Sequence, residues 1–392
     1  MLLTALMLWF IATGVLLFLY GWREMISAWR EPVLSRPILI IESDDWGAGP
    51  VGQASALREI ADILLGFTDC DGRRPVMTLG MILATADGEK TLSSGRYHRQ
   101  VISVQTHTQL LGAIGKGVEE RVFSVQLHGM EHFWPAALMA ASGQDGAIND
   151  WLAHSPEFQT EELPAPLQSR WVDASVLPAR RLSIAAVNQA AQDEVRAFEN
   201  VFGILPSVVV PPTFVWSKDV ESAWAKAGIS VIVTPGCRYE TRDEAGRPAA
   251  RGGAIYNGQS CDNGLVYLVR DTYFEPVLGH TAHQALDAVL SKTRLGRPTL
   301  FETHRFNFLG SDEKRQHALD ELGGLLRMSL ARLPDLAFIS SEKLAMIFRS
   351  RDPEWLEQRF RRRLHVWINR LGELPRLRKL AWLTGWIVPA VL

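Results

Sequence analysis

Short apolar runs alternate with helical patterns along most of this chain of 392 residues. Strands of four to eight residues that are separated by helices indicate a parallel sheet with helical crossovers. No GxGxxG motif follows the first run, and seven or eight strands in one chain favour a barrel over an open sheet. The predicted strands are residues 37–42, 76–83, 122–127, 207–210, 229–233, 265–269, 299–302 and 336–339. The predicted helices are residues 54–65, 133–141, 184–201, 218–227, 281–293, 313–331 and 341–348.

Two long segments interrupt this alternation. Residues 142–178 are rich in Pro, Ser, Trp and charge, and residues 237–263 are rich in Gly, Arg and Asp. Each follows a strand or a strand-plus-helix unit, which is where barrel enzymes build their active sites. We therefore expect both segments to form active-site rims, with plain surface insertion as the alternative.

The beginning of the chain is strongly apolar. Residues 1–20 contain no charged side chain, and at helical rise they span about 30 Å, the hydrocarbon thickness of a bilayer. A basic stretch before the run and a small-residue cleavage site, both typical of a signal peptide, are missing. The sequence therefore predicts a membrane anchor over residues 1–22; a signal peptide and a buried core helix are the alternatives. Arg23, Arg30 and Arg36 follow the run, which favours a cytoplasmic location over a periplasmic one.

The end of the chain combines basic residues with tryptophans and aliphatic side chains. The basic residues are Arg359, Arg361, Arg362, Arg363, Arg370, Arg376, Arg378 and Lys379. This composition suits an amphipathic segment at an anionic membrane interface, whereas a solvated helix packed on the core is the alternative. We thus divide the chain into an anchor (1–22), a barrel (37–348) and a membrane-associated tail (349–392).

The overall charge excludes one class of partner. The formal net charge is -2, whereas binding to nucleic-acid phosphates needs a clear basic excess. The three cysteines lie far apart and form no CxxC pattern, so a cysteine-based metal site is not expected.

Three predicted strands end in residues that can do chemistry. Asp44 and Asp45 follow the first strand, and adjacent carboxylates are usually tolerated when a cation or a proton relieves their repulsion. Neighbouring side chains diverge in a strand or sharp turn, so one carboxylate can bind a metal while the other remains free as a base. The alternative without a catalytic role is that Asp45 caps a turn and Asp44 is solvated.

The third predicted strand delivers His128, and His132 lies four residues later. If the turn leads into a helix, the two imidazoles can share one face and converge on a metal. A later strand ends at His304, which could protonate a leaving group or could be a hydrogen-bonded rim residue.

This combination resembles the NodB-like polysaccharide deacetylases, carbohydrate esterase family 4, over about residues 37–348. Ser43-Asp44-Asp45-Trp46-Gly47 resembles the first motif of the family, and His128 and His132 match its H-x3-H motif. The resemblance implies a distorted (β/α)7-8 barrel of the NodB type. It also implies that Asp44 is the general base and that Asp45, His128 and His132 bind one divalent metal, for which zinc is the first candidate. Glu302-Thr303-His304 looks like the late Leu-x-His motif, which implies that His304 is the general acid.

The chain departs from the family pattern around the base and the acid. Val210 stands where the family often has the Arg that pairs with the base, and Arg270, Asp271 or Glu275 are candidates to replace it. Glu302 and Arg305 flank His304, which points to a charged or unusual sugar.

We assign further side chains near the motifs to substrate contacts or to an alternative catalytic role. Trp46 and Trp216, like Trp134 and Phe214, could stack on sugar faces. Glu131 or Glu302 would act as base if Asp44 does not.

The resemblance predicts metal-dependent deacylation, N- or O-deacetylation first, of a carbohydrate. The candidate substrates are a lipid-linked glycan intermediate and an envelope or exported polysaccharide; the further partners are membrane lipid and the machinery that makes envelope polysaccharide. Two alternatives remain open. One is a catalytically degenerate barrel that binds glycan or acts as a scaffold, suggested by the missing Arg. The other is a zinc peptidase, because residues 128–132 also read H-x-x-E-H; it needs a helix through both histidines and a later carboxylate such as Glu194 or Glu199.

Overall fold

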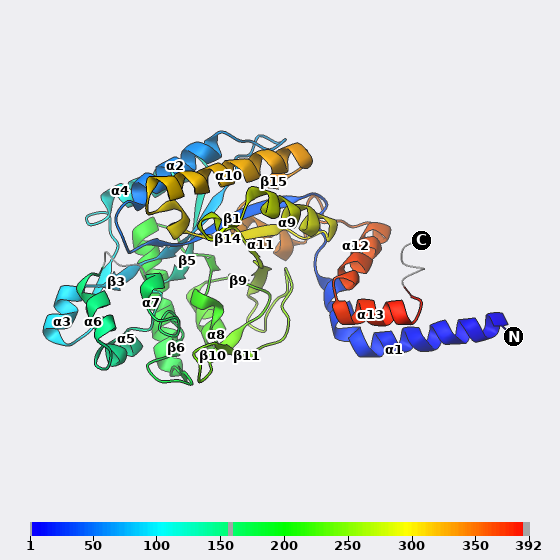
Figure 1. Cartoon of the computed structure of the whole chain (residues 1–392), viewed down its shortest axis with the longest axis horizontal. Helices are drawn as coiled ribbons and strands as arrows, with labels where there is room; N and C mark the ends of the chain where they lie inside the picture. Colours follow the sequence, from blue (N-terminus) through cyan, green and yellow to red (C-terminus); the bar gives the residue numbers. More distant parts are fainter. Residues whose placement is uncertain (1, 156–159, 387–392) are drawn as a thin grey trace.

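The computed structural model describes residues 2–155 and 160–386 (Figure 1). Its centre is a sheet of nine strands in which all paired strands are parallel. Eight of them follow the order β12-β9-β8-β5-β2-β1-β14-β13, and β15 pairs with the beginning of β1. The strands are β1 (Ile38–Gly47), β2 (Met77–Ile82), β5 (Phe123–Gly129), β8 (Val208–Val209), β9 (Val231–Thr234), β12 (Val266–Val269), β13 (Thr272–Tyr273), β14 (Thr299–His304) and β15 (Ala337–Phe338).

The two edge strands of this order belong to one continuous segment of chain. β12 pairs with β9, and β13 pairs with β14 at the opposite edge. Arg270 and Asp271 are the two residues between them, so this segment joins both edges and completes the ring. The predicted distorted (β/α) barrel is thereby confirmed. Its eight strands occupy seven positions around the ring, because β12 and β13 share one.

The two faces of the strands pack against different layers. Along β1, Leu39 and Ile41 pack with the surrounding helices, whereas Ile38 and Ile40 belong to the apolar interior of the barrel. Side chains on a strand alternate between its faces, so the sequence of β1 satisfies both layers. The surrounding helices are α2 (Gln53–Leu65), α4 (Thr108–Glu119), α7 (Ile184–Phe202), α8 (Lys218–Ala227), α9 (Ala282–Arg294) and α10 (Asp312–Arg332).

A further helix, α11 (Ser341–Ser350), packs one face against the apolar interior of the barrel, and its other face is exposed. Leu344, Ile347 and Phe348 pack with Ile38 and Ile40 in one buried cluster. The predicted strands and helices are all found, with shifts of a few residues at their ends. One helix of the surrounding layer, α4, was missed because its three glycines, Gly112, Gly115 and Gly117, lower the helix propensity.

The two predicted rims and the neighbouring connections carry small elements that the sequence analysis did not predict individually. They include three antiparallel pairs of short strands. α5 lies among them and was predicted, with a start two residues early. These elements are β3 (Ala84–Ala86), α3 (Gly88–Ser94), β4 (Arg99–Val101), α5 (Pro135–Ser142), α6 (Gly146–Ala153), β6 (Val172–Asp173), β7 (Arg180–Arg181), β10 (Tyr239–Arg242) and β11 (Pro248–Arg251).

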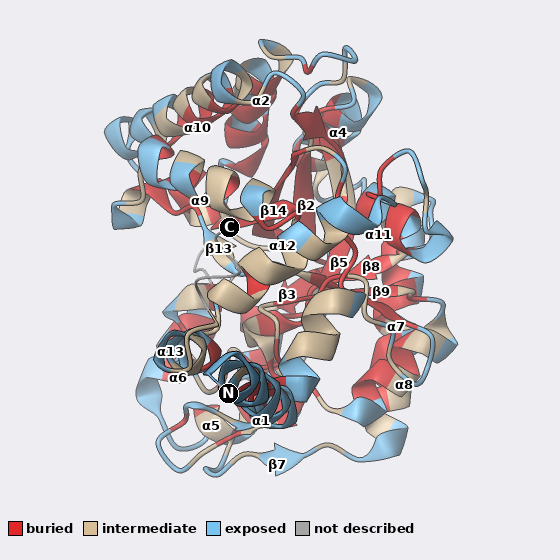
Figure 2. Cartoon of the chain, turned by 90° about the vertical axis from the view of Figure 1, so that its right-hand side faces the viewer, coloured by how far each residue is buried: buried red, intermediate tan, exposed pale blue. Residues whose placement is uncertain are grey.

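The N-terminal apolar run forms the long helix α1 (Leu2–Arg30), which protrudes from the barrel (Figure 1). In the described part of the chain it is the one helix that could cross a membrane by length and composition, a test that a signal sequence also passes. The backbone leaves helical values at Gly21, and the charged residues Arg23, Glu24 and Arg30 follow this kink. Most side chains of the protruding part of α1 are exposed, as the colours of Figure 2 indicate. Insertion of residues 1–22 into a membrane stays a prediction.

The basic tail folds as α12 (Phe360–Gly372) and α13 (Pro375–Leu383) and is described as far as residue 386. α12 packs against α1, and α13 runs beside α1 (Figure 1). The tail is therefore helical and rests on the N-terminal helix, whereas its predicted place in a membrane interface remains a prediction.

Arg370 of α12 connects α1 to the barrel. Its side chain is buried, and burial lowers its pKa to about 10 although Glu31 opposes this shift, so the guanidinium is charged at neutral pH. It donates to carbonyls at the end of α1 and just before β14, where a cation also interacts favourably with the helix dipole. The five acceptors are the backbone oxygens of Ala28, Glu31, Pro32, Leu295 and Gly296.

We expect Arg370→Ala to lower the free energy of unfolding by about 3 kcal/mol, because buried carbonyls lose their donor. The matched control is Arg361→Ala, which removes an exposed arginine from the same helix. Chemical unfolding in detergent, followed by tryptophan fluorescence, measures both variants. Equal stability of the two variants would contradict the structural role of Arg370.

Candidate active site

The predicted site residues lie at the ends of parallel strands, and these ends meet on one side of the barrel. β1 and β14 pair in register, with Asp44 opposite His304. His128 lies near the end of β5. The inward rows change character along the strands: Ile40 is followed by Glu42 and Asp44. At the same spacing of two residues, Leu268 is followed by Arg270, and Leu300 by Glu302 and His304. A layer of polar side chains therefore lies next to the buried apolar cluster of the barrel interior, toward the ends of the strands.

A bulge in β1 allows two adjacent carboxylates to be buried together. The pairing of β1 with β2 shifts register between Ser43 and Trp46, and Asp45 has a φ of 71°. Aspartate tolerates this left-handed conformation better than most residues, and a bulge redirects a side chain that would otherwise point to the opposite face. Gly80 of β2 provides the space, because a Cβ there would lie 2.4 Å from Asp44 Oδ1.

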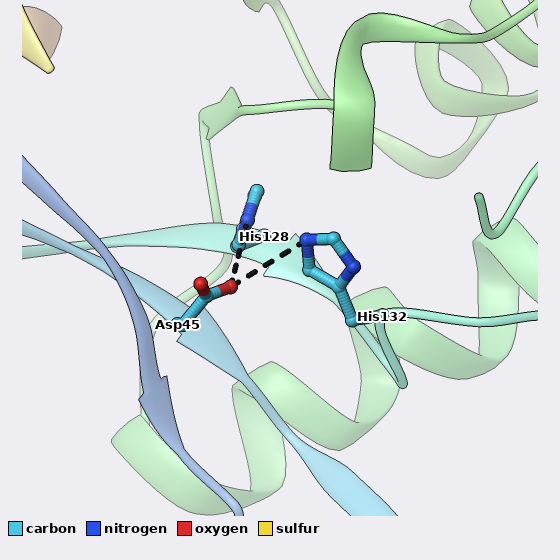
Figure 3. A group of neighbouring side chains, drawn as sticks. All are labelled: Asp45, His128 and His132. Carbon is cyan, nitrogen blue, oxygen red and sulfur yellow. Dashed lines mark ion pairs between the residues drawn. The ribbon is translucent and has the colours of Figure 1, made fainter. Parts of the chain in front are cut away.

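Asp45, His128 and His132 form a group that can hold a metal ion (Figure 3). The Nε2 atoms of His128 and His132 lie 3.3 Å and 3.5 Å from Asp45 Oδ1. All three side chains are buried, yet among the described residues Asp45 Oδ1 has no hydrogen-bond partner. A buried carboxylate oxygen with no donor is rare unless something else satisfies it, and a cation between these atoms would do so.

The protonation of the two imidazoles fits the same role. The His128 Nδ1 lies 2.9 Å from the Val210 carbonyl, which accepts a hydrogen bond from it and leaves Nε2, directed at Asp45, as the atom that can bind a metal. Burial lowers the pKa of His132 to about 4, so this ring is neutral at pH 7. The Asp44 and Asp45 carboxylates raise the pKa of His128 against the effect of its burial, and a bound cation would take the place of the proton that they attract. One carboxylate and two imidazoles are a donor set typical of an open zinc site.

The two histidines reach this position without a helix between them. His128 belongs to β5, and Gly129 then turns the chain with a φ of 132° before α5 begins at Pro135. The expectation that both imidazoles share one helix face is therefore wrong. The peptidase interpretation loses its structural basis, because Glu131 points to Arg170 and Arg99 instead of the metal-ligand group.

Asp44 is held by Arg270, the residue that closes the ring. Arg270 donates to Asp44 Oδ2 at 2.6 Å and to Glu42 at 2.8 Å, and its Nε lies 3.3 Å from Glu302. Burial opposes ionisation, but Arg270 and His128 outweigh it and lower the pKa of Asp44. Asp44 is thus ionised at neutral pH, and its Oδ1 is buried without a hydrogen-bond partner among the described residues. Arg270 occupies the role that the sequence analysis left open at Val210.

His304 is oriented by Glu275, which follows β13. The His304 Nδ1 lies 2.6 Å from Glu275 Oε1, and Glu275 is itself held by Asn307 and Thr303. Burial opposes the charged ring, but Glu275 and the Asp45 carboxylate raise the pKa of His304 to about 10. His304 therefore carries a proton at neutral pH and keeps its Nε2 free of this interaction.

Asp44, Glu302 and His304 form a second group with metal-ligand spacing. Here a cation is already present, because the Arg270 guanidinium contacts both carboxylates. The arrangement suits one metal on the Asp45 side and an acid–base pair on the other side.

The remaining predicted residues lie at different distances from this centre. Trp46 and Trp216 are fully buried, with their indole N–H groups bonded to Ser43 and Glu221, so neither ring is accessible to a sugar. Glu131 is likewise buried within its arginine network, and Asp271 turns outward to Lys292. The predicted substrate contacts of these side chains are therefore not supported by their positions.

Arg305 does lie beside the site, together with a residue that the sequence analysis missed. Its Nη2 is 3.7 Å from Glu161, in η1 (Thr160–Glu162) of the first predicted rim. Burial and the neighbouring Asp45 raise the pKa of Glu161 to about 7. The unusual length of the rim was the available signal, but nothing in its sequence singles out Glu161. Glu275 was a candidate to pair with Asp44, whereas in the structure it pairs with His304.

The comparisons with known proteins find a distant structural similarity. No family model and no curated protein sequence matches the chain. A family 4 carbohydrate esterase from Streptomyces lividans in complex with acetate is 12% identical, with a TM-score of 0.36, and the match covers 78% of this chain and 92% of that chain. A peptidoglycan deacetylase from Bacillus subtilis is 12% identical, with a TM-score of 0.36 and coverage of 83% and 96%. A 4-alpha-glucanotransferase from Thermococcus litoralis is 10% identical, with a TM-score of 0.41 and coverage of 79% and 40%.

These neighbours include both deacetylases and a transferase, and all of the similarities are low. The chain is thus similar in structure to polysaccharide deacetylases and family 4 carbohydrate esterases, at a distance that leaves the function to be argued from the site itself.

We expect His128→Ala and His132→Ala to abolish stoichiometric metal binding. Loss of a ligand should weaken affinity by more than about 100-fold, the upper range found for residues that merely support ligands. His317→Ala removes an exposed histidine of α10 and serves as the matched control. Metal content after dialysis, measured by atomic emission, tests this set. Full occupancy in both site variants would refute the assignment.

Proposed function

We propose that the chain is a metal-dependent hydrolase that removes acyl groups from a carbohydrate. The observation that carries the proposal is that three features lie together at the ends of the parallel strands. They are a metal-ligand group, an ionised carboxylate whose second oxygen has no hydrogen-bond partner among the described residues, and a protonated imidazole. Asp45, His128 and His132 supply the first, Asp44 the second and His304 the third. The carbohydrate class rests on the resemblance of these motifs to those of the NodB-like deacetylases.

The protein residues divide the proton transfers of hydrolysis. Asp44 Oδ1 accepts a proton from the attacking water, whose oxygen forms the new bond to the acyl carbon. His304 Nε2 donates a proton to the departing nitrogen or oxygen as the bond from the acyl carbon breaks. A divalent cation, zinc first, held by Asp45, His128 and His132 would polarise the acyl carbonyl and lower the pKa of the water.

The surrounding residues set the two proton-transfer groups in opposite states. Arg270 holds Asp44 as the carboxylate, and Glu275 holds His304 in its charged form. A pair of titratable groups whose environments separate their protonation states is typical of a base and an acid. The contact of Arg270 with Asp44 supports the enzyme over the scaffold alternative, which rested on the missing arginine at Val210.

We further propose that α1 anchors the protein to a membrane, with lipid as a partner. Arg23, Arg30 and Arg36 favour the cytoplasmic face, and the periplasmic face is the alternative. The substrate would then be a glycan of the cell envelope, either lipid-linked or polymeric, handled near the machinery that synthesises it.

We expect Asp44→Asn to keep its metal but to lose turnover by a factor on the order of 10² to 10⁴, because the amide cannot accept the proton. Asp271→Asn is the matched control, since Asp271 lies beside Arg270 in the chain but pairs with Lys292. Acetate release from acetylated oligosaccharides, together with metal analysis, measures both properties. Near-normal turnover of Asp44→Asn would move the base elsewhere and remove the mechanism.

The side of the membrane is tested by protease treatment of intact spheroplasts. A cytoplasmic barrel should resist digestion until the membrane is broken. A periplasmic barrel that is merely anchored by α1 should be digested in intact spheroplasts. A cytoplasmic marker protein provides the control for leakage. Digestion of the barrel from outside would reverse the proposed topology.

A further inference from the structure

The helix α1 joins the barrel at the end where the strands begin. Leu34, between α1 and β1, forms a bridge with Leu356. Glu31 accepts three hydrogen bonds from Arg297, which stands two residues before β14. The candidate active site lies at the opposite ends of these same strands. A rise of about 3.3 Å per residue puts Asp44 about 20 Å from Ile38 along β1.

This connection is a packed joint and not a loose tether. Arg370 bridges the last turn of α1 and the residues before β14, as described above. The Trp367 indole donates to the Met25 carbonyl at 2.8 Å, and its ring meets Trp29 edge to face. Since these contacts come from buried or half-buried side chains, α1 has a defined direction relative to the strands. Figures 1 and 2 show that direction: α1 extends away from the barrel, and Figure 2 looks along α1 toward the sheet.

α13 lies along the apolar part of α1 through close contacts at glycines. A Cβ on Gly21 would lie 2.6 Å from Leu377, and a Cβ on Gly14 would lie 2.9 Å from Trp386. The Trp386 indole also donates to Thr13 Oγ1 at 3.1 Å. Small residues that allow close helix approach are typical of helix pairs in membranes.

The charges of this helix pair change at one level along α1. On α13, Arg376, Arg378 and Lys379 surround Leu377, which contacts Gly21, and on α1 the first charged residue is Arg23. Beyond this level the exposed side chains of the described residues of both helices are uncharged and mostly apolar, and they include Leu16, Leu19 and Trp382. Basic residues at the boundary of an apolar surface match the headgroup layer of an anionic bilayer.

We infer that the barrel stands upright on the membrane, with the beginnings of its strands toward the lipid and its active site facing away from it. The inference rests on the proposed function, and it specifies the substrate: acyl groups on a soluble or membrane-distant part of a glycan. A sugar linked directly to a membrane lipid lies on the wrong side of the barrel to reach Asp44 and His304. Of the two substrate classes considered from the sequence, the orientation favours the polymer.

Energy transfer from the protein to headgroup-labelled lipid tests the orientation without any enzymatic assay. The native Cys70 is exposed, and its sulfur lies 3.2 Å from Arg36, just before β1, so a donor dye there reports the strand beginnings. Val51 is 92% exposed and follows the end of β1, so Val51→Cys in a Cys70→Ser background reports the site end. Both proteins carry Cys261→Ser, because Cys261 is partly exposed and would also react.

In nanodiscs containing acceptor lipid, the dye at Cys70 should transfer energy strongly and the dye at Val51→Cys weakly. Arg370→Ala should reduce this difference, whereas Arg361→Ala should preserve it. Equal transfer from both dyes, or stronger transfer from the site end, would overturn the inference.

The substrate is tested with an acetylated oligosaccharide in water and the same acetylated sugar linked directly to a lipid. In detergent, where both can approach the site, full-length protein should hydrolyse both. In nanodiscs we expect hydrolysis of the soluble oligosaccharide and loss of hydrolysis of the lipid-linked sugar. Equal rates on both in nanodiscs would overturn the inference. Hydrolysis of neither in detergent would instead overturn the proposed function, and the dye measurement would still decide the orientation.

Discussion

One buried guanidinium makes the polar end of this barrel possible. Arg270 lies among Glu42, Asp44 and Glu302, three carboxylates on two adjacent strands, at the point where the chain closes the ring. Unpaired buried carboxylates would be very costly and would take up protons. With Arg270 present, Asp44 remains ionised while one of its oxygens stays free. The same guanidinium occupies the place where a second cation could bind, so the metal ion and the proton transfers that we propose would lie on separate sides of the site.

The closure of the barrel explains why this arginine can come from an unexpected strand. In an open sheet, a residue that directly follows β12 would lie far from β1. In this barrel, the segment from Val266 to Tyr273 contacts both edges of the sheet, so Arg270 points into the same space as Asp44. A closed ring allows one position to be supplied from several strands. The role expected near Val210 is therefore filled from across the barrel, and the Val210 carbonyl serves His128 instead.

Local sequence patterns predicted the parts of the structure that depend on local physics. The main strands follow from apolar runs, and the residues Asp44, Asp45, His128 and His304 follow from their positions at strand ends. Pairings that join distant segments were not accessible in this way. Glu275 and His304 are 29 residues apart, and Glu161 reaches Asp45 from a long connection whose sequence has no period. The aromatic side chains near the motifs were misjudged because Trp46 and Trp216 contribute to the core, a role that proximity in sequence does not exclude. The left-handed Asp45 was also not foreseeable, because the bulge depends on the pairing of β1 with β2.

The attachment of α1 by α12 and α13 has a consequence for biosynthesis. The contacts of Arg370 with the end of α1 link residues that are more than three hundred positions apart. During translation α1 emerges long before α12, so the nascent chain carries its apolar helix before Trp367 and Arg370 can pack against it. The final direction of the barrel is set when α12 docks, after every strand has been made. The packing that gives α1 its direction is thus completed late in synthesis, and a chain whose last helices fail to pack would lack the contacts of Arg370 and Trp367 with α1.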